Sequence, residues 1–253
     1  MKTFTNALLI LGLCITPVAS AEDWSFGIGT GISALDVDGD GGFNTRLLGP
    51  IDFDASLEPD QVRDLAESAF GLGGFARKGP WTLTYSVGRL TLEEDVSAVQ
   101  GGNSGTLDLN FETNGAEFLV HYAFTSSGKH TWSVIGGLRY TDQEYEVELV
   151  INGNEVFDGS VDDDWTDGIL GLSYSYAFSN TLSWNTQVDY GFGGTDGTAH
   201  FNTGLSKVSG NWMFIGALDF KAIDYEEGNR GDSDWYLYDA DETILGISFM
   251  YLY

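Results

Sequence analysis

The chain has 253 residues, of which 42% are hydrophobic and 14% aromatic, and its 38 acidic against 11 basic side chains give a formal net charge of −27. A charge this negative disfavours binding to nucleic-acid phosphates, so we expect no nucleic-acid partner. The aromatic content argues against intrinsic disorder, and a single cysteine excludes a disulfide scaffold. The length alone fits one large or two small domains.

The start of the chain has the pattern of a secretory signal peptide. A lysine near the N-terminus precedes an apolar run over residues 7–19, and an Ala-Ser-Ala cleavage site ends at residue 21. The apolar run is too short to span a bilayer as a helix. We therefore predict that residues 1–21 are removed and that residues 22–253 form a single domain. The only cysteine leaves with the signal peptide, which excludes disulfides and a catalytic thiol from the mature chain.

After this segment, apolar residues alternate with small or polar residues at a period of two, which is typical of β-strands. One such set of apolar positions is Trp81, Leu83, Tyr85 and Val87. The same alternation recurs in segments that begin near residues 24, 132, 170, 182, 212 and 245. No mature segment approaches the ~18 consecutive apolar residues of a transmembrane helix.

Two architectures produce this alternation: a soluble sandwich with its apolar face inside, and a membrane barrel with its apolar face in lipid. The barrel is favoured because the polar positions are rich in glycine and serine rather than in lysine and glutamate. Aromatic residues also bracket the segments, as interfacial girdles do. These residues are Trp81, Trp132, Tyr140, Phe178, Trp184 and Phe192.

The connections between the segments alternate between short and long. The short ones lie near residues 78–80, 126–129, 179–180 and 208–211, and the others at 34–65, 92–105, 141–162, 193–197 and 226–240. This pattern predicts an all-β fold, a closed antiparallel transmembrane β-barrel of ten strands, with eight or twelve as the alternatives. We expect long acidic extracellular loops and both termini on the periplasmic side, where short turns lie in such barrels.

The segment 51–68 breaks this regular pattern. Ile51 and Phe53 alternate only briefly, and the residues from Asp60 to Ser68 have a helical pattern with Pro59 at its start. We expect a helix within a loop or a partial plug of the lumen.

The sequence resembles the small outer-membrane β-barrel proteins of Gram-negative bacteria, the OmpA/OmpW-like group. The signal peptide, the alternating strands, the short turns and the motifs at 75–81 and 223–226 carry this resemblance. The last strand is similar to the C-terminal signal that the barrel-assembly machinery reads, with Phe249, Tyr251 and Tyr253 on one face. The resemblance implies an integral outer-membrane location, with outer-membrane lipid, lipopolysaccharide and the assembly machinery as partners.

Charged residues fall on the predicted inner face of several strands. They are Glu117, His121, Arg139, Asp167, Asp189, Asp219 and Lys221. Because buried charges need partners, we predict a lumen network in which Arg139 pairs with Glu117 on one side and Asp167 on the other. Such a network would close a narrow barrel, and a small gated pore is the alternative.

The sequence contains two further candidate sites. Asp36, Asp38 and Asp40 match the first half of a calcium-binding loop, but Leu47 stands where a bidentate glutamate belongs. We expect no cofactor beyond a loosely bound Ca²⁺ there. His200, which we place near the outer rim with Asp196, does not complete the signature of an outer-membrane protease or of a lipid A deacylase.

The leading functional hypothesis is a structural or surface-interaction barrel without enzymatic activity. The second is a small porin-like channel for small solutes or cations, which acidic loops would select by charge. The third is an outer-membrane hydrolase that acts on lipid or peptide.

Overall fold

The structure, a computed structural model, describes residues 23–45, 49–100, 103–152 and 154–253. The predicted signal peptide, residues 1–21, and residue 22 lie outside these residues. In the described part the chain is almost entirely β-strand, with one short helix. The elements are β1 (Ser25–Thr45), β2 (Gly49–Asp54), α1 (Pro59–Leu65), β3 (Ala66–Lys78), β4 (Trp81–Gln100), β5 (Asn103–Ser127), β6 (His130–Ile151), β7 (Asn154–Ser179), β8 (Leu182–Phe192), β9 (Gly197–Ser209), β10 (Trp212–Glu227) and β11 (Tyr236–Leu252).

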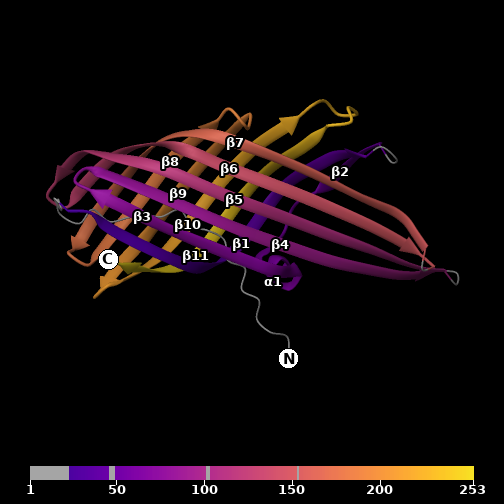
Figure 1. The fold of residues 1–253 in the computed structure, drawn as a ribbon, viewed down its shortest axis with the longest axis horizontal. Helices are drawn as coiled ribbons and strands as arrows, with labels where there is room; N and C mark the ends of the chain where they lie inside the picture. The colour runs from indigo at the N-terminus through magenta and orange to yellow at the C-terminus, as the bar shows by residue number, and fades with distance from the viewer. Residues whose placement is uncertain (1–22, 46–48, 101–102, 153) are drawn as a thin grey trace.

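The strands close into a barrel. The order runs from β11 through β3 to β1, all pairs are antiparallel, and β1 pairs in turn with β11 (Figure 1). Ten strands form this closed ring, and β2 is an extra strand that pairs with residues 40–45 of β1. The prediction of a closed antiparallel barrel of ten strands is therefore confirmed.

Tight turns join the strands at one end of the barrel. They lie after β3, β5, β7 and β9, at the four places that the sequence predicts. Gly79, Gly128 and Gly210 have φ values of 56°, 60° and 59°, a left-handed conformation that glycine adopts without strain. The start of β1 and the end of β11 lie at this same end, because Gly27 pairs with Leu252 and Ser25 with Arg77.

The segments predicted as long loops are mostly strand, which corrects that prediction. β4 and β5 continue to Gln100 and from Asn103, and β6 and β7 continue to Ile151 and from Asn154, so these hairpins project far beyond the other strands (Figure 1). The acidic runs at 93–95 and 162–164 therefore lie on strands.

These residues stay in strands because the alternation at a period of two continues, but apolar residues now occupy the inward positions and polar residues the outward ones. On the part of β6 near the tight turn, Trp132 faces outward and Ser133 inward. Beyond Arg139, the inward positions become apolar, with Tyr145 and Val147 packed against the interior, while Glu146 is exposed on the outside. The barrel wall thus passes from an apolar exterior with a polar lumen to an acidic exterior with an apolar interior.

The apolar exterior forms a belt around the whole barrel. Large hydrophobic side chains are exposed on every strand of the closed ring, and the six predicted girdle residues are between 37% and 50% exposed. A contiguous apolar surface of this kind fits the hydrocarbon of a lipid bilayer. In the part of the chain that the structure describes, no helix is long and apolar enough to cross a membrane.

The 49–66 segment fills a gap in the wall between β1 and β3. The β1–β3 ladder ends at the Gly29–Gly73 pair, and the β1–β2 ladder begins only at Asp40. Helix α1 lies near β1 and β4 (Figure 1), and its Val62 is buried. The helix begins at Pro59 as predicted but ends at Leu65, because β3 begins at Ala66.

Candidate functional site

A network of charged side chains crosses the lumen where the apolar belt gives way to the acidic exterior. Its centre is Arg139 of β6, which is only 7% exposed. The Nε and Nη2 atoms of Arg139 donate to Oε2 of Glu117 at 2.9 and 2.7 Å, and Nη2 also donates to Oδ1 of Asp189 at 3.1 Å. The guanidinium therefore joins β5, β6 and β8.

His200 of β9 continues the network. Its Nδ1 is 2.6 Å from Oδ2 of Asp189, and its Nε2 is 2.8 Å from Oδ2 of Asp219. Amide donors add to the carboxylates, because Gln187 donates to Asp189 at 2.7 Å and Asn202 donates to Asp219 at 2.9 Å. All of these side chains are buried, and each charged group has a partner of opposite charge. Two buried atoms of the network, Nη1 of Arg139 and Oδ1 of Asp219, have no hydrogen-bond partner within the described ranges.

The network spans the full width of the barrel. From Glu117 on β5 it passes through Arg139, Asp189 and His200 to Asp219 on β10. In the ten-strand ring, β5 and β10 are five strands apart in either direction, so they face each other across the lumen. A chain of bonded side chains thus runs from one wall to the opposite wall.

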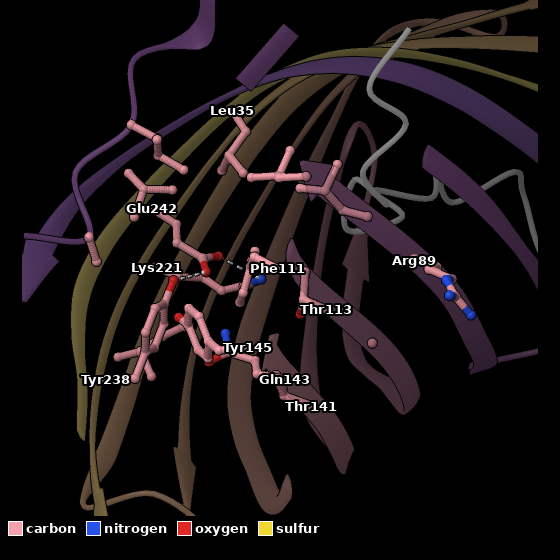
Figure 2. Close-up of a pocket in the computed structure, with 18 of the residues that line it drawn as sticks. Leu35, Arg89, Phe111, Thr113, Thr141, Gln143, Tyr145, Lys221, Tyr238 and Glu242 are labelled. Atoms are coloured by element: carbon pink, nitrogen blue, oxygen red, sulfur yellow. Dashed lines mark hydrogen bonds and ion pairs between the residues drawn. The ribbon is translucent and has the colours of Figure 1, made fainter. Parts of the chain in front are cut away.

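A second pair lies beside this chain. Nζ of Lys221, on β10, donates to Oε2 of Glu242 at 3.4 Å, and the hydroxyl of Tyr238 donates to Oε1 of the same glutamate at 3.1 Å (Figure 2). Lys221 is therefore neutralised by a carboxylate on the neighbouring strand β11.

Two of the predicted network residues have different partners. Asp167 is the register partner of Arg139, but its carboxylate accepts bonds from the backbone N–H and hydroxyl of Thr195, both at 2.9 Å, and from the hydroxyl of Thr198 at 3.0 Å. The β8–β9 connection, which contains Thr195, supplies these donors. The predicted Arg139–Asp167 pair is therefore wrong. His121 faces the lumen and contacts Thr84 at 3.2 Å, apart from the main chain of bonds.

The structure corrects the predicted position of His200. It lies inside the barrel and not at the rim with Asp196, which is exposed. Its register partners are Asp189 on β8 and Lys221 on β10, so the strand alignment contained the signal. Both ring nitrogens contact carboxylates, which leaves neither free to take a proton from a substrate or a water molecule.

The lumen on the turn side of this network is filled with small polar side chains. Asn185 accepts from Ser175 at 2.7 Å and donates to Ser206 at 3.1 Å, and Ser206 is 2.9 Å from Ser183. All four are buried. A residual cavity of about 40 Å³ remains beside them, which is room for little more than water.

The candidate calcium residues do not lie on a loop. Asp36, Asp38 and Asp40 alternate along β1 and are exposed on its outer face, opposite Thr243, Asp241 and Asp239 of β11. The prediction of a loop at Asp36, Asp38 and Asp40 is therefore wrong. Leu47, the last position of that predicted loop, lies outside the described residues. Among the residues described, no cluster of three His, Cys, Asp or Glu side chains is arranged to hold a metal ion.

The C-terminal aromatic residues lie on the lipid-facing side of the closing strand. Phe249 and Tyr251 are exposed on β11 and pair with Thr30 and Ile28 of β1. Tyr253, which is 72% exposed, donates its backbone N–H to the carbonyl of Phe26 at 3.0 Å. These residues therefore occupy the seam where the barrel closes.

The barrel is similar to solved structures, although no protein-family model matches its sequence, and neither does any curated protein. The outer membrane protease OmpT from Escherichia coli matches with a TM-score of 0.58 at 8% identity, over 94% of this chain and 99% of that chain. The chain has the fold of an outer-membrane β-barrel.

Two other solved barrels match with lower scores. The translocator domain of the autotransporter NalP from Neisseria meningitidis has a TM-score of 0.46 at 13% identity, over 91% of this chain and 90% of that chain. Neisserial surface protein A has a TM-score of 0.34 at 12% identity, over 90% of this chain and 95% of that chain. At these identities the likeness concerns the fold alone.

Proposed function

We propose that the protein is an integral outer-membrane β-barrel that is closed to solutes and serves a structural or surface-interaction role. The observation that carries the proposal is the chain of bonded side chains from Glu117 on β5 to Asp219 on β10. Moving an ion past this chain would require breaking buried ion pairs, each of which is costly to open. The packed serine and asparagine side chains on the turn side add a second barrier.

The acidic exterior of the barrel beyond the apolar belt supports the surface role. On β6 the residues that alternate outward include Asp142, Glu144 and Glu146, and on β1 they are Asp36, Asp38 and Asp40. A surface of one charge sign attracts partners of the other sign and divalent cations diffusely. Such cations would reduce repulsion from anionic lipopolysaccharide. With both termini periplasmic, this surface faces the exterior. Membership of the OmpA/OmpW-like group is part of the proposal and rests on the sequence resemblance.

Swelling of proteoliposomes tests the closed lumen. Vesicles that contain the folded protein should swell in arabinose no faster than empty vesicles, whereas vesicles with a general porin should swell rapidly. Swelling at a porin-like rate would favour the channel hypothesis instead. Cleavage of peptide or lipid A that is lost in His200→Ala would favour the hydrolase.

A further inference from the structure

A large cavity lies above the charged network, inside the part of the barrel that extends beyond the apolar belt. Its volume is about 560 Å³, within the range of roughly 300–1,000 Å³ found for small-molecule sites. Residues of β1, β2, β4, β5, β6, β7, β9, β10 and β11 line it. Members of the network, among them Glu117, Arg139 and Asp219, form its floor. The Lys221–Glu242 pair lies beside them in the same cavity (Figure 2).

The wall of the cavity is mainly apolar and aromatic. Phe111 and Tyr145 have ring centroids 4.6 Å apart, and Phe53 meets Tyr145 edge-on at 5.4 Å. Leu35, Leu90 and Ile223 add aliphatic surface. Such a wall offers water few hydrogen-bond partners, so replacing the water by an apolar molecule is favourable.

The charges at the floor restrict the head group of that occupant. Glu117, Asp167, Asp219 and Glu242 line the cavity together with the basic side chains Arg139, Lys221 and His200. All three basic side chains are already paired with carboxylates, and so is Arg89, which lines the wall and pairs with Glu112. A carboxylate ligand would therefore meet surplus negative charge without a free cation, and its desolvation would not be compensated.

One position of the wall has space that a side chain could fill. Gly115 of β5 lines the cavity, and a Cβ atom added to it would meet no atom within 4 Å. Gly216 of β10 also has no atom within 4 Å of an added Cβ, but it lies on the exposed outer face. The two glycines therefore accept the same substitution on opposite sides of the wall.

We propose that this cavity is a binding site for one small, uncharged hydrophobic molecule. The site goes beyond the proposed structural or surface role, and it is compatible with a closed lumen because the cavity lies on one side of the charged network. The apolar wall supplies the affinity, and the surplus of carboxylates at the floor excludes anionic amphiphiles.

Binding of the uncharged fluorophore N-phenylnaphthylamine to the protein in lipid nanodiscs tests the site. Gly115→Trp should weaken binding about tenfold or more by filling the cavity, while Gly216→Trp should bind as the wild type does. Gly115→Leu, a smaller change, should weaken binding to a lesser extent. Heat-dependent gel mobility checks that each variant is folded. Equal binding by all four proteins would show that the probe occupies only lipid and would overturn the proposal.

Competition with a matched pair of molecules tests the charge preference. Octanol and octanoate carry chains of the same length and differ in the charge of the head group. Octanol should displace the probe from the wild type at a concentration at least about tenfold lower than octanoate. Displacement by octanoate at an equal or lower concentration would overturn the assignment of an uncharged ligand.

Discussion

Nη2 of Arg139 lies 3.1 Å from Oδ1 of Asp189, although β7 separates the two strands that carry them. The guanidinium therefore passes over its neighbouring strand and reaches into the lumen rather than along the wall. Because the same nitrogen also binds Glu117 at 2.7 Å, one side chain holds two carboxylates from different parts of the ring. This arrangement makes Arg139 the central residue of the network.

Arg139→Ala should lower the free energy of unfolding by about 3–5 kcal/mol, because Glu117 and Asp189 would lose their buried counter-charge. Urea unfolding in lipid vesicles, followed by tryptophan fluorescence, measures the change. The variant should remain closed to solutes because the serine and asparagine packing below the network is intact.

Arg89→Ala is the matched control for that variant. Arg89 pairs with Glu112 on the outer surface, and its side chain is 54% exposed. Loss of an exposed pair costs only about 0–1 kcal/mol. Equal destabilisation by the two substitutions would contradict a buried, tightly bonded network.

The sequence predicts the inward direction of Arg139 but not all of its partners. Alternation with Leu138 and Tyr140, which are exposed, fixes the face of the strand on which Arg139 lies. The acidic residues on the two strands next to β6 are Glu117 and Asp167, so the sequence predicts both as partners. Only Glu117 is bonded to Arg139. A long side chain can reach beyond the next strand, and the path of a loop decides which donors meet Asp167. Neither effect follows from the period of two.

The extended hairpins are the part of the fold that the sequence does not predict. Strand number and turn positions follow from the alternation and from the short polar connections. Where the exterior becomes acidic, as at Glu144 and Glu146, the apolar signal moves to the inward positions Tyr145 and Val147. If strands are predicted from outward apolar residues alone, they are therefore predicted to end too early, and the remaining strand residues are assigned to loops.

The folded protein should migrate faster on denaturing gels when it is not heated. A closed barrel keeps every backbone hydrogen bond satisfied and resists detergent until it is boiled. Samples before and after boiling give the comparison directly. Identical mobility would argue against a closed barrel.

Replacement of both Phe249 and Tyr251 by Ser should reduce the amount of protein assembled in the outer membrane. Both side chains face outward at the seam between β11 and β1, where they meet lipid as the barrel closes. Deletion of Tyr253 should have the same direction of effect. Ser248→Ala, on the inward face of the same strand, is the control. Normal membrane levels of the double variant would count against an assembly signal here.

Asp52→Asn should speed tryptic cleavage after Arg230 by about two- to fivefold, the size expected for loss of an exposed ion pair. The side chains of Asp52 and Arg230 form an ion pair that ties β2 to the β10–β11 connection. The hydrogen bond from Arg230 holds the pKa of Asp52 below its ordinary value of 3.8. The pair is therefore complete at neutral pH and is lost as the pH falls through this lowered pKa.

Asp241→Asn serves as the control for that experiment, because Asp241 is exposed on β11 at a position that pairs with Asp38 and Ala222. Cleavage after Arg230 at the same rate in all three proteins would mean that the Asp52 pair does not restrain the connection.

Recording of ionic current across a planar bilayer tests the central claim most directly. The claim is that the bonded side chains from Glu117 to Asp219, together with the packed serine and asparagine side chains on the turn side, close the lumen. With the folded wild-type protein inserted in KCl solution, we predict no stable open channel. A steady conductance that scales with the number of inserted barrels would contradict the account.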